Sequence, residues 1–184
     1  MNDVKPILFN TDMVRAILDG RKTVTRRVVN HKHLRGLENL TAEKIERACK
    51  APYKCGDVLY VRETWARLCF GLCTQIYVYR ASEEPPFPKI IPIGCHLTDH
   101  FKWRPSIHMP KDAARIFLRV TGVRVERLQD ITDEDVVAEG LPIGCYFDDL
   151  WDKTVKPADR GRYGWKANPW VWVIEFERCK GPEV

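Results

Sequence analysis

The chain has 184 residues, of which 45% are hydrophobic and 30% charged, and its formal net charge is +5. This length and composition fit one soluble globular domain with a substantial core, and the mild basicity permits an anionic partner without requiring one. No stretch approaches the roughly 18 to 20 apolar residues of a membrane span, so we expect no membrane partner.

The N-terminus and the cysteines indicate a cytoplasmic protein. Residues 1–6 carry no long apolar run, so we expect no signal peptide. Seven cysteines are an odd number at irregular spacings, which favours a reducing compartment over a disulfide framework. Cys69 and Cys73 come nearest to a metal-binding pair, but the tight C-x-x-C spacing of a structural zinc site does not occur. We therefore expect no metal and no cofactor.

The N-terminal part predicts a strand, a short helix and a second strand. Residues 6–9 suit a strand, and Thr11 is placed to cap the helix that follows. The buried stripe of that helix consists of Met13, Val14, Ile17 and Leu18, which recur at helical spacing. Gly20 suits the left-handed position after a helix, so the next strand is expected from Thr23 to Val29.

The middle of the chain alternates expected strands with irregular segments. Thr41 is expected to cap a short helix within a polar stretch, and the expected strands are residues 58–65 and 76–80. Three prolines place residues 83–88 in a loop or at a sheet edge. Prolines also bracket residues 103–110, which we expect to form an ordered but irregular loop.

The C-terminal part predicts the remaining elements. They are strands at 116–120 and 123–128 broken at Gly122, a helix capped by Thr132 and closed by Gly140, a helix at 147–154 with Leu150 and Trp151 inward, a mobile charged loop at 159–165, and a strand at 170–177. The pattern indicates an α+β fold, a mixed β-barrel with helices on its rim. We expect one domain over residues 1–184, with insertions around 31–52 and 81–110.

Lys22 and Thr25 form the first candidate site. Four cations and two threonines occupy residues 20–27. Neighbouring positive charge disfavours a protonated amine, so we expect the pKa of Lys22 to be lowered, and a lysine that loses its proton can activate the hydroxyl of Thr25. The alternative is that the basic residues answer the dipole of the preceding helix and the threonines simply suit a strand.

Three stretches, in order along the chain, resemble motifs of the ASCH family. They are ILDGRKTVTR at 17–26, KCGDVLYV at 54–61 and DITDEDVVAEG at 130–140. The chain is most similar to the longer ASCH-like proteins common in bacteriophages and prophages. The resemblance implies a PUA-like barrel related to RNA-binding domains. A small bacterial member of the family removes the acetyl group from N4-acetylcytidine, so the resemblance also implies amide hydrolysis at an acylated cytosine.

The same resemblance implies catalytic roles for Lys22, Thr25 and Glu139. In this hypothesis Thr25 attacks the acyl carbon, Lys22 accepts its proton, and Glu139 orients Lys22 or the leaving amine. Residues three apart in a strand face opposite ways, so Lys22 can share a face with Thr25 only if it precedes the strand. A carboxylate at a helix C-terminus is unfavourable, so Glu139 is expected to need a cationic partner such as Lys22. The family has an apolar residue where Arg26 stands, before an arginine that matches Arg27, which leaves open a larger substrate or a pocket that only binds.

Basic and aromatic residues predict a surface for RNA or a modified nucleoside, because unpaired bases stack on aromatic rings and phosphates attract cations. The candidates are Arg21, Arg26, Arg27, Arg62, Trp65, Trp103, Arg104 and His108. We expect the loop at 103–110 to line the same cleft as Lys22. The alternatives are that the tryptophans are core and the arginines solvated, that the chain is a non-catalytic RNA-binding module, or that it binds a host protein.

Overall fold

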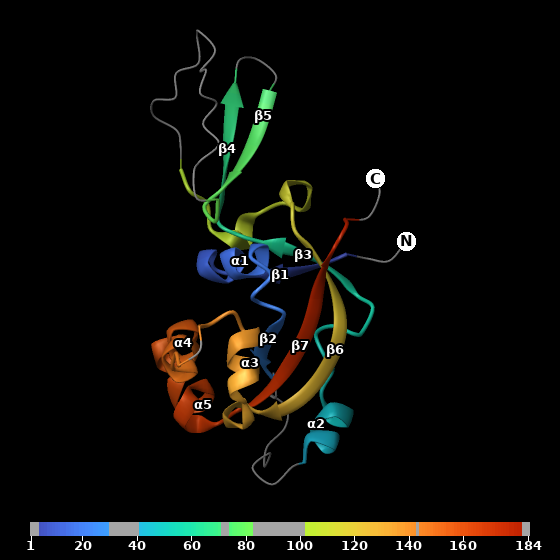
Figure 1. Cartoon of the computed structure of the whole chain (residues 1–184), viewed down its shortest axis with the longest axis vertical. Coiled ribbons are helices and arrows are strands. Elements are labelled where there is room, and N and C mark those ends of the chain that lie inside the picture. Colours follow the sequence, from blue (N-terminus) through green and yellow to red (C-terminus); the bar gives the residue numbers. More distant parts are fainter. Residues whose placement is uncertain (1–3, 30–40, 71–73, 83–101, 143, 182–184) are drawn as a thin grey trace. The chain divides into compact units, whose positions relative to one another are not determined.

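The structure is a computed structural model that describes residues 4–29, 41–70, 74–82, 102–142 and 144–181 (Figure 1). The loop expected at 83–88, and much of both expected insertions, lie outside the described residues. The chain divides into two compact units, the first of Met1–Asp19, Val58–Leu118 and Arg178–Val184 and the second of Gly20–Asp57 and Arg119–Glu177. No helix within the described ranges is long and apolar enough to span a membrane.

Five strands form a mixed sheet in the order β1-β3-β6-β7-β2. Their bounds are β1 Lys5–Leu8, β2 Val24–Val28, β3 Val58–Arg62, β6 Phe117–Arg127 and β7 Trp170–Cys179. β1 and β3 are parallel, whereas β2 and β7 are antiparallel. The expected mixture of strands and helices is confirmed, but the expected closed barrel is wrong for the described part of the chain, where β1 and β2 are the edges of an open sheet.

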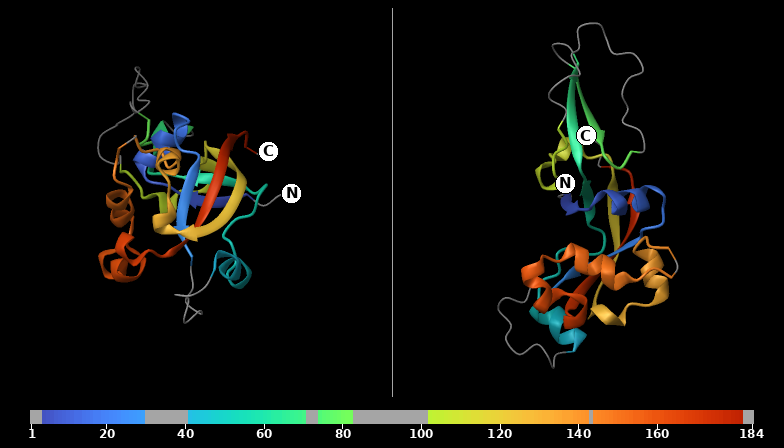
Figure 2. Two further views of the ribbon diagram at one scale, coloured as in Figure 1. Left: turned by 60° about the horizontal axis from the view of Figure 1, so that its bottom comes forward. Right: turned by 90° about the vertical axis from the view of Figure 1, so that its left-hand side faces the viewer.

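The first unit contains helix α1 (Thr11–Leu18) and a hairpin of β4 (Trp65–Phe70) and β5 (Thr74–Tyr79) (Figures 1 and 2). The N-cap of α1 is Asn10 rather than Thr11, because the Asn10 side chain accepts a hydrogen bond of 2.8 Å from the Met13 backbone nitrogen. Thr11 takes the first helical position instead. Gly20 follows the helix with a φ of 75°, as expected.

The strand expected over residues 58–65 is divided between β3 and β4. Glu63 lies at the break, is only 1% exposed, and receives two hydrogen bonds of 2.9 Å from the Arg115 guanidinium. This ion pair ties the buried Glu63 to Arg115 and so fixes the chain between the two strands. Part of the expected irregular loop at 103–110 forms a short 3-10 turn, η2 (Ser106–His108).

Helices pack on one face of the β2–β7 pair in the second unit. They are α3 (Asp133–Ala138), α4 (Phe147–Thr154) and α5 (Arg160–Tyr163), and Figure 1 shows all three on the same side of these strands. Phe147 and Trp151 enter a core with Val24, Val171 and Val173. On the other side, α2 (Ala42–Ala48) lies beside β6, where Glu46 accepts a hydrogen bond from the Val125 backbone.

Two expectations for the second unit are wrong. β6 runs unbroken through Gly122, where the missing side chain makes room for a neighbour, since a Cβ there would lie 2.6 Å from an Oε atom of Glu175. Residues 159–165 form helical turns instead of a mobile loop. Their end is fixed because Trp165 packs on Phe147 and donates its backbone N–H to Asp152 at 2.8 Å.

Candidate functional site

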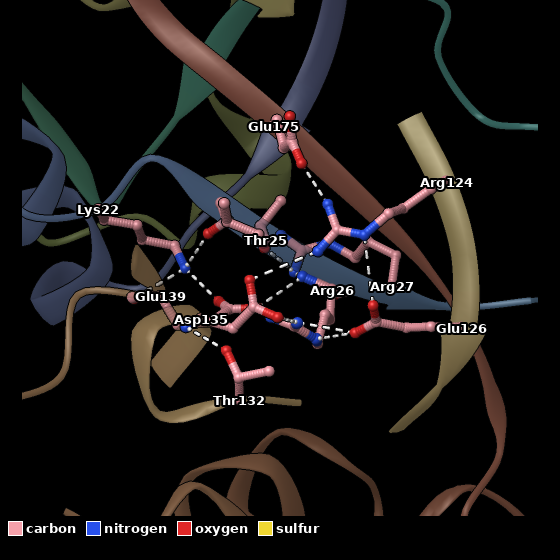
Figure 3. A network of polar contacts seen from close by, with 11 residues as sticks. Lys22, Thr25, Arg26, Arg27, Arg124, Glu126, Thr132, Asp135, Glu139 and Glu175 are labelled. Carbon is pink, nitrogen blue, oxygen red and sulfur yellow. Dashed lines mark hydrogen bonds and ion pairs between the residues drawn. The ribbon is translucent and has the colours of Figure 1, made fainter. Parts of the chain in front are cut away.

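Lys22 and Glu139 form a buried ion pair, as the sequence predicted (Figure 3). Lys22 lies between the end of α1 and the start of β2, and Glu139 is the C-cap of α3. The Lys22 Nζ donates to the Val24 carbonyl at 2.8 Å, to the Glu139 carbonyl at 2.9 Å, and to the Glu139 carboxylate. These contacts use all three ammonium donors. Lys22 is 2% exposed and Glu139 5%.

Arg26 joins the pair from strand β2, and its guanidinium is fully buried. Its backbone N–H donates to Glu139 at 2.9 Å. Its guanidinium contacts three carboxylates, Glu126 at 2.7 Å, Asp135 at 2.7 Å and Glu139 at 3.3 Å. A phosphate would have to displace these carboxylates to reach Arg26, so this structure gives Arg26 an organising role rather than an accessible binding role.

The same contacts cover the open edge of β2. The Val24 carbonyl accepts from Lys22, the Arg26 backbone N–H donates to Glu139, and the Thr23 backbone N–H donates to the Ala138 carbonyl at 2.8 Å. Unpaired backbone groups at a sheet edge otherwise invite pairing with another strand. The Lys22–Glu139 pair therefore has a clear structural function, and this is also why the sheet does not continue past β2 here.

Burial lowers the pKa of Lys22, while the Glu139 carboxylate opposes the shift and the nearby Arg27 and Arg26 reinforce it. The expected direction is confirmed, but its main cause is desolvation rather than the neighbouring cations. Burial also lowers the pKa of Arg27, and Glu139 opposes that shift too.

Thr25 and Arg27 lie on the face of β2 opposite to Arg26, as strand alternation requires. Thr25 is 1% exposed, and its hydroxyl oxygen accepts a hydrogen bond of 2.8 Å from Arg27. The same Arg27 nitrogen donates to the Arg26 carbonyl at 3.0 Å. Positive charge beside the hydroxyl oxygen favours the negative charge that develops there when its proton leaves.

A further group of charged side chains, centred on Arg124, lies next to the carboxylates that bind Arg26, and the sequence did not predict it. Arg124 contacts Glu126 and Asp135 at 3.4 Å each and forms an ion pair with Glu175 (Figure 3). The available sequence signals were the alternation of Arg124 and Glu126 along one strand, and the placement of Asp135 four residues before Glu139 on one helix face. Neither signal identifies the cations that these carboxylates meet.

The other candidate residues are distributed between the units. Arg21 is exposed in the second unit and donates to the Gly140 carbonyl at 2.7 Å. The rest belong to the first unit, namely Arg62, Trp65, Trp103, Arg104 and His108. Lys22 belongs to the second unit, so the common cleft stays a prediction.

Within the first unit, Trp65 is the centre of a small cluster. It is 4% exposed, packs with Met109, and pairs through its backbone with Arg104. The Arg104 guanidinium lies 5.4 Å from the centroid of the Trp65 ring. Trp103 is partly buried and packs against Ala66 and Val78, and His108 is exposed. Trp65 is thus a core residue, with an exposed cation beside it.

The described residues contain no group of three or more His, Cys, Asp or Glu side chains suited to a metal ion. Among the described residues, Cys49, Cys55 and Cys145 are free cysteines. Cys73 and Cys95 lie outside the described residues, and so does the side chain of Cys69.

No protein-family model and no curated protein matches this sequence. Among solved structures, the chain is similar to the crystal structure of protein EF3133 from Enterococcus faecalis V583, family model DUF984, with 12% identity and a TM-score of 0.43. The match covers 90% of this chain and 65% of that one, so the chain spans about two thirds of that protein's length. A likeness this distant carries no argument about function.

Proposed function

We propose that this chain acts on RNA or a modified nucleoside, and that it hydrolyses the amide of an N4-acylated cytosine. The observation that carries the proposal is the buried Lys22–Glu139 pair, whose lysine precedes Thr25 by three residues in the chain. A desolvated lysine with a lowered pKa is suited to proton transfer, and the arginine beside the Thr25 hydroxyl is suited to stabilising negative charge there. The motif resemblance supplies the substrate class.

The proposed reaction begins with Lys22 in its neutral form, which burial favours because it lowers the pKa of the Lys22 ammonium group. Lys22 then accepts the Thr25 proton as the Thr25 oxygen bonds to the acyl carbon. The carbon–nitrogen bond breaks, the cytosine amine takes the proton from Lys22, and water hydrolyses the ester on Thr25.

Access to the nucleophile is the main requirement of this proposal. Thr25 and Lys22 are almost fully buried, so a substrate reaches them only if neighbouring side chains or the end of α3 move. The lysine must also release one of its three hydrogen bonds to act as a base. The proposal therefore predicts slow turnover unless a substrate itself opens the site.

The test is incubation of the protein with a panel of N4-acylated cytidines, free and within short RNAs, with chromatography to measure deacylation. Thr25→Val keeps the shape of the side chain without the hydroxyl, and Thr25→Ser keeps the hydroxyl. We expect turnover by the parent and by Thr25→Ser, and none by Thr25→Val. Lys22→Met is expected to lower kcat by about 10²- to 10⁴-fold, the usual contribution of a general base.

Thermal unfolding of each variant separates catalysis from the structural role of the pair. Thr25→Val should unfold near the parent temperature, so its loss of activity would report chemistry. Absence of turnover by the parent on every substrate would overturn the hydrolase. Binding of RNA without turnover would favour a non-catalytic module, and neither result would leave a protein partner as the remaining hypothesis.

A non-catalytic RNA-binding function is supported by a separate observation, the exposed Arg104 beside Trp65 and the exposed His108 in the same unit. Each phosphate contact to single-stranded nucleic acid adds about 0.7 to the slope of log affinity against log salt. Arg104→Ala should reduce that slope by about 0.7. Lys166→Ala removes an exposed charge elsewhere and is the matched control. Equal slopes for parent and Arg104→Ala would exclude this contact.

A further inference from the structure

A pocket of about 470 Å³ lies on the outer side of α3. The helix lines it with Asp133, Glu134, Val136 and Val137, and the following turn adds Cys145 and Tyr146. Successive helix residues are rotated by about 100°, so Asp133 and Val137 project away from the side that carries Asp135 and Glu139. The pocket therefore belongs to the face of α3 that the ion-pair network does not use.

The local charge is opposite to that of the whole protein. Residues 128–152 contain eight carboxylates and no lysine, arginine or histidine, which leaves 17 of the 25 acidic residues to the rest of the chain, against all 30 lysines and arginines. Asp135 and Glu139 neutralise buried cations. Asp133 and Glu134 instead line the pocket and are exposed, so they offer their charge to a ligand.

The rest of the lining is apolar and aromatic. Val137 is 40% exposed and Tyr146 is 79% exposed. An exposed tyrosine ring attracts a cation to its face, and the two valines offer contact to an aliphatic stem. Hydrogen bonds from its own backbone and from Thr132 lower the pKa of Glu134, so its carboxylate is ionised at neutral pH.

We propose that this pocket binds a small organic cation, an ammonium or guanidinium group on an apolar stem. The cation meets Asp133 and Glu134, and the stem lies on Val136, Val137 and Tyr146. The volume falls within the roughly 300 to 1,000 Å³ of small-molecule sites. This inference does not depend on the proposed hydrolase activity, because no residue of the pocket belongs to that site.

The binding test compares ligands of similar length and different charge. Hexylammonium carries one ammonium group and agmatine carries a guanidinium and an ammonium group, whereas hexanol and hexanoate replace the cation by a neutral and an anionic group. Calorimetric titration of the full chain should show saturable binding of both cations, with hexanol and hexanoate at least about tenfold weaker, equivalent to about 1.4 kcal/mol. Equal affinity for hexanol and hexylammonium would overturn the proposal.

The rate at which Cys145 is alkylated can show whether the ligand binds in this pocket. It is a free, exposed cysteine in the pocket lining, and Cys55 is a free, exposed cysteine outside that lining. Alkylation by iodoacetamide, followed by peptide mass spectrometry, gives a rate for each. Agmatine should slow the modification of Cys145 and leave Cys55 unchanged. Protection of both or of neither at saturating agmatine would contradict the site.

Variants assign the recognition to individual groups. Asp133→Asn with Glu134→Gln should weaken agmatine binding by about tenfold or more, as expected for loss of charge-assisted hydrogen bonds. Asp130→Asn with Asp149→Asn changes the net charge equally outside the lining and should have little effect. Tyr146→Ala removes an exposed ring without disturbing the core and should also weaken binding.

Two results would exclude this occupant. If the two double variants weaken agmatine binding equally, the cation is attracted by the general negative charge of this region and not by a specific site. If a lysine- or arginine-containing tripeptide protects Cys145 and neither small cation does, the pocket takes a protein side chain instead.

Discussion

The substitution Glu139→Gln tests whether the Lys22–Glu139 pair is held as two buried charges. Each carboxylate oxygen has its own donors, one receiving Lys22 and the other the backbone and guanidinium of Arg26. Glutamine has one carbonyl oxygen, so its amide group must turn a donor toward one of these donors. Breaking a buried ion pair from one side costs about 3–5 kcal/mol, because the remaining charge stays in the interior.

The measurement is urea unfolding for the free energy and thermal unfolding for the melting temperature, both followed by circular dichroism. A cost of about 3–5 kcal/mol corresponds to a fall of roughly 6–20 °C in melting temperature for a chain of this size. Lys22→Met in the Glu139→Gln background should recover part of the loss, with a coupling of about 1–3 kcal/mol. Glu126→Gln is the control, since Arg26 then keeps two carboxylates, and we expect about 1 kcal/mol. A Glu139→Gln cost no larger than that of Glu126→Gln would refute the reasoning.

Three further predictions concern other parts of the chain. Burial raises the pKa of Tyr79 from 10.0 to about 12. Between those values the unfolded chain loses a proton that the folded chain keeps, so stability should fall as pH rises from 10 to 12, and Tyr79→Phe should flatten that fall in urea titrations. Gly122→Ala should destabilise the folded protein by about 1 kcal/mol, because the new Cβ contacts Glu175. In a Glu175→Ala background the same substitution should stabilise the protein slightly, since only the entropy of the unfolded chain changes. Equal effects in both backgrounds would contradict this. Asn168 has a φ of 43° and accepts a 2.9 Å hydrogen bond from the Gln129 backbone, so Asn168→Ala should cost more in thermal unfolding than Asn168→Gly, by about 1 kcal/mol.

Local sequence signals located most elements correctly. Thr132 caps α3 with a 3.2 Å hydrogen bond, and Gly20 and Gly140 adopt the left-handed conformation after their helices. These features depend on residues a few positions apart, and the energies involved are local. The errors also have local causes. Asn10 competes with Thr11 for the same cap, and a strand with Gly122 in its middle has the same local signal as two strands.

The motif resemblance singled out Lys22 and Glu139 as partners, and two local arguments supported their pairing. A carboxylate at a helix C-terminus needs a cation, and the lysine had to precede its strand to avoid the alternation of faces. Both arguments use only backbone geometry and charge. They do not depend on how the sheet is closed, which is why they survive although the expected barrel is not formed in the described part of the chain.

Only the tertiary structure decided which cations are buried and which remain exposed. Arg26 and Arg27 are neighbours in sequence, yet strand alternation places Arg26 among three carboxylates and Arg27 against the Thr25 hydroxyl. The partners of Arg26 are more than 95 residues away in the chain, since they lie at Glu126, Asp135 and Glu139. Desolvation depends on everything packed around a group, so burial, and with it the lowered pKa of Lys22, follows from the fold rather than from the motif.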